Sequence, residues 1–276
     1  MHTFGNRKNP TLLVLHGIGT GHRLWLRQIE RFQATHFVIA PDLPGLTAEA
    51  GHDVGIPAIA KNLTDQLASE AFDDINVCGI SAGASVALAM ALCDRPRIAR
   101  LVLSAPQVRA PRLMLSLQIA IIALMLEKAI IGVSQRMLSS DPEIAQAAAE
   151  DCRAMGKPGM LSALRALKAL DLHQALPKIN APALILCGEK DPANLPAARL
   201  IARSLPRARL HVQPGAGHLW NVQLADRFNE VLAGELDSDP RGPQSAITEP
   251  LPAFVRQPRA ERASRQGRSF LQAAAA

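Results

Sequence analysis

Cysteine is scarce in this chain of 276 residues, and none of its four cysteines belongs to a CxxC pair or to a pattern with zinc-type spacing. This absence argues against the usual zinc and dithiol motifs, so we expect no metal site. Cys78 and Cys187 fall inside predicted strands, which favours buried, reduced thiols and a cytoplasmic protein. Cys93 and Cys152 could pair only if the fold brought them together.

The chain also lacks a recognisable secretory signal and the signatures of nucleic-acid-binding domains. The apolar run Leu12–Leu15 is far too short for the hydrophobic part of a signal peptide. The net charge of +6 is unevenly distributed, because six Arg and two Glu from Pro240 onward supply +4 of it. The rest of the chain is close to neutral and contains no RNP, zinc-finger or helix-turn-helix pattern. We therefore expect no nucleic-acid partner.

No apolar run reaches the roughly 20 residues that a membrane-spanning helix needs. The longest candidate, Leu113–Leu126, has fourteen residues, is broken only by Ser116 and Gln118, and ends at Glu127-Lys128. We expect it to form a helix buried under a cap. Two alternatives stay open. One is an apolar wall facing a lipophilic substrate. The other, attachment to a membrane surface, is disfavoured because the run has no Lys/Arg-rich polar face.

Short apolar strands alternate along the chain with segments of helical periodicity. The predicted strands are Thr11–Leu15, His36–Ala40, Ile75–Cys78, Ile98–Ser104, Ala183–Cys187 and Ala208–Val212, with His2–Phe4 giving one short edge strand at most. The predicted helices are residues 22–34, 56–70, 84–92, 196–204 and 219–236. Several strands are continuously apolar, which is typical of a parallel sheet covered by helices on both faces. The fold class is therefore α/β, with a doubly wound, mostly parallel sheet of about six to seven strands.

A long interruption separates the fourth of these strands from the fifth. From Gln107 to about Leu176 the composition is helical and contains no convincing strand. We expect residues 107–176 to form a helical cap over the strand ends, inserted into a core made of residues 1–106 and 177–236. Residues 237–276 are rich in Pro, Gly, Ser and Arg, and we expect them to be a disordered tail.

The sequence Gly79-Ile80-Ser81-Ala82-Gly83 has the form G-x-S-x-G and lies between a β-prone run and an Ala/Leu-rich helical run. A serine at a tight turn from strand to helix presents its hydroxyl to substrate, and the small neighbours let the chain pass close to itself. The pentapeptide alone occurs by chance in many chains. Its position between a strand and a helix predicts that Ser81 is a nucleophile.

A serine nucleophile needs a base within hydrogen-bond reach and an acid that orients the base. In doubly wound sheets these groups come from loops at the carboxyl ends of strands. Asp191 follows the fifth predicted strand and His218 follows the sixth. Taken singly, Asp191 could be a helix cap and His218 a surface residue, and Glu189 competes for the acid role. The order Ser81, Asp191, His218 favours the catalytic interpretation.

The oxyanion of an acyl-transfer intermediate needs backbone N–H donors, commonly worth ~2.7–4 kcal/mol each. We expect one donor at Ala82, directly after the nucleophile. The other is expected at Ile18, in the glycine-containing loop after the first predicted strand, where Gly17 and Gly19 let the backbone approach substrate. His16 in that loop rivals His218 as the base, but its position indicates that it supports the loop through hydrogen bonds.

These motifs together make the chain resemble the α/β-hydrolase superfamily across residues 11–236. His16–Gly19 resembles the HGxG oxyanion loop, Pro41–Gly45 the D-x-P-G segment, and Gly79–Gly83 the nucleophile elbow, while Gly188–Asp191 and Gly217-His218 resemble the acid and base loops. The resemblance implies a helical lid after the fourth strand. The chain departs from the family at its N-terminus, where only ten residues precede the first predicted strand, and we expect the family's N-terminal hairpin to be shortened. It also implies Ser81–His218–Asp191 chemistry without a cofactor.

The function predicted from these residues is hydrolysis of an ester or thioester of a small to medium apolar acid through an acyl-enzyme on Ser81. Carbon–carbon bond hydrolysis, perhydrolysis and acyl transfer on the same triad stay open, because fold alone does not choose among them. An alternative from another class is a non-catalytic module that binds an apolar ligand. The expected partner is a small-molecule acyl substrate, and the sequence leaves the oligomeric state undetermined.

Overall fold

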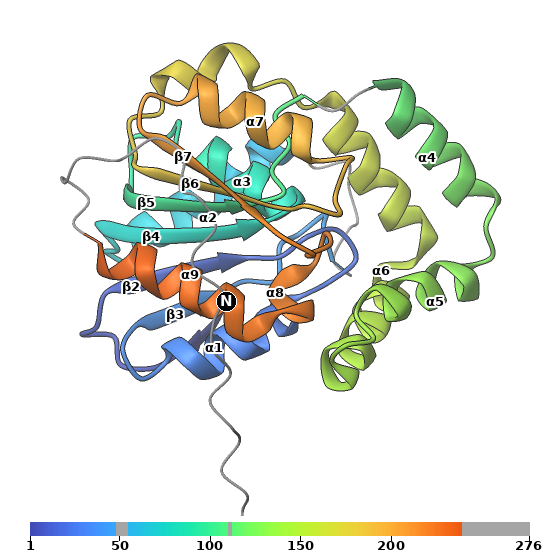
Figure 1. Cartoon of the computed structure of the whole chain (residues 1–276), viewed down its shortest axis with the longest axis horizontal. Coiled ribbons are helices and arrows are strands. Elements are labelled where there is room, and N and C mark those ends of the chain that lie inside the picture. The colour runs from blue at the N-terminus through green and yellow to red at the C-terminus, as the bar shows by residue number, and fades with distance from the viewer. Residues whose placement is uncertain (48–54, 110–111, 239–276) are drawn as a thin grey trace, which may run out of the picture.

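The computed structural model describes residues 1–47, 55–109 and 112–238, and in these residues a seven-stranded sheet forms the centre of the molecule (Figure 1). The strand order is β1-β3-β2-β4-β5-β6-β7, and only β1 runs antiparallel to its neighbour, β3. The strands are β1 His2–Phe4, β2 Thr11–Leu15, β3 Phe37–Ala40, β4 Asp74–Ile80, β5 Arg97–Ser104, β6 Ala183–Gly188 and β7 Ala208–Gln213. The predicted α/β class and mostly parallel sheet are confirmed.

Helices cover both faces of this sheet (Figure 1). The core helices and turns are η1 His22–Trp25, α1 Leu26–Phe32, α2 Ile56–Ser69, α3 Ala82–Met90, η2 His173–Lys178, α7 Leu195–Ser204, α8 Trp220–Gln223 and α9 Ala225–Asp237. Helices α2, α3 and α7 contribute to one hydrophobic cluster, and α1, α8 and α9 contribute to the other. Two cores of this kind require a sheet that is apolar on both sides.

Strand β2 shows how the sequence meets this requirement. Successive side chains of a strand point to opposite faces. Leu13 and Leu15 accordingly join the cluster under α2 and α3, whereas Leu12 and Val14 join the cluster under α1 and α9. All four are 1% exposed or less. The continuous apolar run in the sequence therefore reflects burial on both faces.

Two helices begin or end differently from the sequence prediction. The predicted helix at residues 22–34 starts as a short 3₁₀ turn, and only Leu26–Phe32 is α-helical. The predicted helix at 219–236 is divided at Leu224, whose φ of −133° and ψ of 52° are not helical. Hydrophobic periodicity alone does not reveal such local turns, because the apolar spacing continues through them.

Between β5 and β6 the chain forms three helices, α4 Arg112–Leu124, α5 Glu127–Met137 and α6 Pro142–Ala169. Figure 1 shows them together on one side of the molecule, beyond the end of the sheet. Helix α6 starts at the side-chain cap of Asp141, which accepts from the Ile144 N–H, and is kinked at Gly156, where φ is 64°. The segment is helical in the described residues, as predicted.

Ion pairs join α6, the longest of these three helices, to the core. Arg27 on α1 makes a two-pronged contact with Asp141, at 2.7 and 3.1 Å, and also contacts Glu143 at 2.9 Å. Arg23 on η1 contacts Glu150 at 2.7 Å and Asp151 at 2.8 Å. A two-pronged arginine–carboxylate contact fixes direction as well as distance. These contacts set the start and first half of α6 against the core.

The prediction that Leu113–Leu126 lies buried under a cap is wrong. Leu115 is the one residue of α4 that is fully buried, whereas Leu113, Leu117 and Leu124 are 84%, 61% and 87% exposed. Helix α4 packs against α6 along one side and leaves its other apolar side open. An apolar run in the sequence predicts a helix with an apolar surface. It does not tell which other element, if any, covers that surface.

The four cysteines are all free thiols, and Cys78, Cys152 and Cys187 are buried. Burial raises the pKa of the Cys187 thiol to about 12, so it stays protonated at neutral pH. The expected burial of Cys78 and Cys187 is confirmed, and the structure does not bring Cys93 and Cys152 together as a pair. No helix in the described ranges is long and apolar enough to cross a membrane. The predicted tail lies, from residue 239 onward, outside the described residues.

Candidate active site

Ser81 lies between the last residue of β4 and the first residue of α3. Its φ of 55° and ψ of −122° are unusual for a residue with a side chain. The Ser81 N–H donates to the carbonyl of Ser104 on β5 at 2.8 Å, and the Ser81 carbonyl accepts from Ala84 and Ser85 in the first turn of α3. The surrounding hydrogen bonds thus hold a strained turn, as is common at reactive side chains.

Glycines make this turn sterically feasible. A Cβ on Gly79 would lie 2.7 Å from the Gly83 carbonyl oxygen, and a Cβ on Gly83 would overlap the carbonyl oxygens of Leu15 and His16. Helix α3 therefore begins in direct backbone contact with the end of β2. The contact brings Ser81 next to the loop after β2, where a Cβ placed on Gly17 would lie 3.4 Å from the Cβ of Ser81.

Asp191 and His218 come together from the loops after β6 and β7. His218 Nδ1 donates to Asp191 Oδ2 at 2.7 Å. Asp191 is 5% exposed, whereas the His218 side chain is 24% exposed. Because a carboxylate only accepts, the ring proton lies on Nδ1, and Nε2 of the neutral imidazole is left as an acceptor. The sequence order thus places an acid and a base in hydrogen-bond contact.

The competing carboxylate, Glu189, points elsewhere. Its Oε2 accepts from the Gly215 N–H at 2.8 Å, and it therefore braces the loop before His218 rather than the imidazole. Gly188 lets these two loops meet, since a Cβ there would overlap the carbonyl oxygens of Ala216 and Gly217. The structure brings together Asp191 and His218, and it separates Glu189 from the ring.

Asn194 is a polar contact that the sequence analysis missed as a functional group. Its Nδ2 donates to both oxygens of Asp191, at 2.8 and 2.9 Å, and lies 3.2 Å from His218 Nδ1. Gln107 Nε2 donates to Asn194 Oδ1 at 2.6 Å, which fixes the direction of the amide. Gln107 is held in turn by Ser85, whose Oγ donates to its carbonyl at 2.7 Å. The only sequence signal is an Asn three residues after the acid.

These neighbours determine the ionisation of Asp191. Burial raises the pKa of the carboxyl, but the hydrogen bonds and charge of His218 and the hydrogen bonds of Asn194 together outweigh it. The net pKa of Asp191 is therefore below its ordinary value of 3.8. Hydrogen bonds that favour a carboxylate keep it ionised. An ionised Asp191 can stabilise a protonated His218.

His16 is fully buried and makes two hydrogen bonds that define the loop after β2. The Leu43 N–H donates to Nε2 at 2.9 Å, so Nδ1 carries the proton and donates to the Gly17 carbonyl at 2.8 Å. Burial lowers the pKa of His16 below 6.5, although the Gly17 hydrogen bond opposes the shift. A buried, neutral imidazole that is occupied at both nitrogens is poorly suited to serve as a base. Its geometry matches the supporting role expected of it.

In the part of the chain that the structure describes, the backbone N–H groups expected to hold the oxyanion, those of Ala82 and Ile18, donate no backbone hydrogen bond. Ala82 is the first residue of α3, where an N–H has no acceptor within the helix. In the loop after β2, the Gly19 N–H is occupied by the Leu46 carbonyl at 3.0 Å. Among the described residues, no hydrogen bond occupies the N–H of Ile18, and none joins Ser81 Oγ to His218. Such catalytic contacts often tighten only when substrate is bound.

The helices between β5 and β6 reach this loop through Met160. A Cβ on Gly19 would lie 2.7 Å from the Met160 Cε, so this α6 side chain lies directly against the expected oxyanion loop. Asp151 lies nearby, because a Cβ on Gly21 would meet Asp42 at 2.8 Å and Asp151 at 3.0 Å. Helix α6, one of the three helices between β5 and β6, therefore borders the loop after β2.

One cluster in the described part of the chain could hold a metal ion. His2, His22 and Asp42 each offer a ligand atom within 4.8 Å of the others. The two imidazole rings are stacked, however, with centroids 3.6 Å apart and planes 21° apart. Lone pairs in two nearly parallel ring planes do not converge on one point. The arrangement fits Asp42 as a shared hydrogen-bond acceptor for both rings, at 3.0 Å each.

The fold and this arrangement define an α/β hydrolase. The family model described as the alpha/beta hydrolase family matches residues 12–231, and the chain belongs to that family. The protein is accordingly a hydrolase. It is 28% identical over 256 residues to a poly(3-hydroxyalkanoate) depolymerase from Ectopseudomonas oleovorans, a match covering 88% of each chain.

Two further similarities come from lactone-cleaving relatives. The chain is 24% identical over 246 residues to 3-oxoadipate enol-lactonase 2 from Acinetobacter baylyi, covering 83% of this chain and 90% of the other. The crystal structure of the enol-lactonase from Burkholderia xenovorans aligns with a TM-score of 0.74 and 22% sequence identity, covering 86% and 95% of the two chains. At that identity, the structural similarity supports the shared fold.

Proposed function

We propose that the protein is a serine hydrolase that cleaves an ester bond through an acyl-enzyme on Ser81, with His218 as base and Asp191 as the acid that orients it. The observation that carries this proposal is the 2.7 Å contact between His218 Nδ1 and Asp191, which leaves Nε2 free to accept a proton. The positive φ of Ser81 supports it, because this turn exposes the hydroxyl.

In the proposed reaction, Ser81 Oγ attacks the carbonyl carbon while its proton passes to His218 Nε2. The negative oxygen that forms is held by the N–H groups of Ile18 and Ala82. Protonated His218 then donates to the leaving alcohol as the carbon–oxygen bond breaks. A water molecule, deprotonated by the same imidazole, attacks the acyl-enzyme. The acyl–Oγ bond then breaks as His218 returns the proton to Ser81 Oγ, and the acid is released. Asp191 stays ionised throughout and stabilises the imidazolium.

The proposed substrate is an ester or thioester of a small to medium apolar acid. The relatives named above are a polyester depolymerase and an enol-lactonase, and both names describe ester chemistry. Ile18 packs on the main hydrophobic cluster, and Met160 of α6 lies against the same loop. An acyl chain leaving the site on this side would contact apolar side chains.

A panel of p-nitrophenyl acyl esters of increasing chain length tests the proposal. Wild-type protein should hydrolyse them with a preference among chain lengths, and Ser81→Ala should lower kcat by about 10⁴-fold or more. The matched control is Ser139→Ala, which alters an exposed serine between α5 and α6. Unchanged turnover in Ser81→Ala would show that another group attacks the ester. Labelling of Ser81 by a fluorophosphonate would also exclude a module that only binds ligand.

A further inference from the structure

Helix α4 carries an apolar surface that nothing in the described chain covers. Its exposed large side chains are Leu113, Met114, Leu117, Ile121 and Leu124, and Leu126, also exposed, lies two residues after the helix ends. The five residues on α4 recur at helical spacing and therefore share one side of the helix. Contiguous exposed apolar patches on soluble proteins mark interaction sites rather than ordinary surface.

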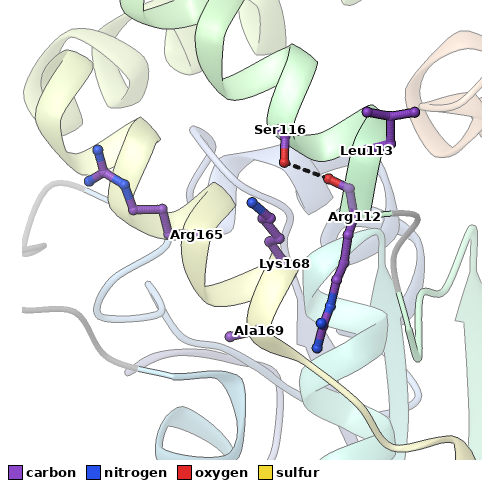
Figure 2. Close-up of a pocket in the computed structure, with 6 residues that line it drawn as sticks. All are labelled: Arg112, Leu113, Ser116, Arg165, Lys168 and Ala169. Atoms are coloured by element: carbon purple, nitrogen blue, oxygen red, sulfur yellow. Dashed lines mark hydrogen bonds between the residues drawn. The ribbon is translucent and has the colours of Figure 1, made fainter.

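A groove of about 540 Å³ lies between the start of α4 and the end of α6 (Figure 2). Three of its six lining residues are cations: Arg112, Arg165 and Lys168. Figure 2 shows Arg112 and Lys168 on facing helices, with Arg165 one turn from Lys168 on α6. In the ranges that the structure describes, none of the three forms an ion pair. The groove is therefore positively charged, and Leu113 of the apolar surface forms part of its wall.

The charge of the surrounding helices has the same sign. Residues 112–169 contain seven Lys or Arg and five Asp or Glu. Four of those acids, Asp141, Glu143, Glu150 and Asp151, pair with Arg23 and Arg27 of the core. Glu127 is thus the one acidic side chain of this segment outside those ion pairs. Because the segment contains seven Lys or Arg, its surface carries a net positive charge.

We propose that this surface, formed by the exposed side of α4 and the Arg112–Arg165–Lys168 groove, docks onto an anionic lipid membrane surface. Helices that lie in a membrane interface combine an apolar side with neighbouring Lys and Arg side chains. Helix α4 supplies the apolar side and Arg112, and the end of α6 supplies Arg165 and Lys168. Anionic headgroups at the groove would let the leucines of α4 enter the acyl region.

A second copy of the chain is a less suitable occupant. In a two-fold dimer, the patch would cover the same patch of a second copy. The second copy presents the same predominantly cationic segment, in which Glu127 is the one acidic side chain outside the ion pairs to the core, whereas an anionic bilayer satisfies both the charge and the apolar side chains. Charge complementarity therefore selects the membrane.

Co-sedimentation of the full-length chain with vesicles tests this. The vesicles contain phosphatidylcholine alone or phosphatidylcholine mixed with phosphatidylglycerol. Wild type should partition onto the anionic vesicles and only weakly onto the neutral ones. The double variant Arg165→Gln/Lys168→Gln should lower partitioning onto anionic vesicles by about 25-fold, because each cation near such a surface contributes roughly a fivefold effect. Leu117→Ser/Ile121→Ser should lower it comparably.

The matched controls are Leu200→Ser and Arg203→Gln, which alter an exposed leucine and an exposed arginine on α7 and should bind as wild type. Hydrolysis of a water-soluble ester monitors folding of every variant. Three results would overturn the proposal: no preference of wild type for anionic vesicles, wild-type binding by both double variants (which would indicate attachment through another part of the chain), or a dimer in light scattering that Leu117→Ser/Ile121→Ser dissociates.

Discussion

Asn194 donates from one amide nitrogen to both carboxylate oxygens of Asp191, at 2.8 and 2.9 Å. The same carboxylate accepts from His218, so the acid is held from two directions. The amide cannot rotate freely, because Gln107 donates to its oxygen. We therefore regard Asn194 as a residue that positions the acid of the proposed triad and keeps it ionised.

Replacing Asn194 tests this role. Asn194→Leu should lower kcat/KM by about tenfold or more, since hydrogen bonds to charged groups contribute ~1.5–3 kcal/mol. Asn194→Asp places a second carboxylate beside Asp191 and near His218. The added negative charge favours the imidazolium, so the pH at which activity is lost on the acid side should move upward. Asn62→Asp, an exposed change on α2, should leave the pH profile as in wild type. A lower rate with an unshifted profile in Asn194→Asp would contradict the electrostatic role.

Gly188 is predicted to be essential for bringing the acid and base loops together. Gly188→Ala places a Cβ against the backbone carbonyl oxygens of Ala216 and Gly217, which have no flexible end that could move aside. Activity should be lost and the melting temperature should fall. The control, Gly234→Ala on α9, meets open space and should stabilise the helix by about 1 kcal/mol. Full activity in Gly188→Ala would show that these loops lie farther apart than described.

The buried His16 makes stability depend on pH in a specific direction. Burial lowers the pKa of His16 in the folded state below 6.5, so beneath that pH the unfolded chain binds more protons than the folded one. The stabilising contribution is therefore present above pH 6.5 and is lost as pH falls, with a slope of at most about 1.4 kcal/mol per pH unit. Denaturant unfolding of His16→Gln should lack this component. The difference between the free energies of unfolding of wild type and His16→Gln, plotted against pH, isolates the contribution of His16. A difference that does not change with pH would contradict the prediction.

Met160 is predicted to limit the length of the acyl chain. Its Cε lies against Gly19, at the loop expected to hold the oxyanion. Met160→Ala removes this flexible side chain and should raise kcat/KM for longer p-nitrophenyl esters relative to shorter ones. Met137→Ala, an exposed methionine on α5, serves as the control. An equal change for all chain lengths would place Met160 outside the acyl path.

Much of the central sheet could be predicted from the sequence because each strand corresponds to a short segment whose own residues favour a strand. The apolar runs at β2 and β6 are short, are bounded by turn residues, and match the observed strands within one residue. The loops that follow them carry His16 and Asp191, and parallel strands bring such loops to one edge of the sheet. The position of Ser81 between β4 and α3 also follows from local signals.

The features that escaped prediction depend on contacts between distant segments. The exposure of Leu113 and Leu117 depends on what α6 covers, and periodicity does not contain that information. The amide of Asn194 is oriented by Gln107, which lies 87 residues earlier in the chain and donates to its oxygen. Likewise, Arg27 forms an ion pair with Asp141, which lies 114 residues later in the chain. Such contacts arise from the packed fold and leave no short pattern in the sequence.

The central claim is that Ser81 is an activated nucleophile, and intact-protein mass spectrometry after treatment with a fluorophosphonate tests it most directly. Wild type should gain the mass of one phosphonyl group, located on the peptide that contains Ser81, and lose esterase activity in parallel. His218→Ala should react far more slowly, and Ser81→Ala should gain no mass. Phosphonylation elsewhere with Ser81 unmodified, or unchanged labelling in Ser81→Ala, would contradict the account.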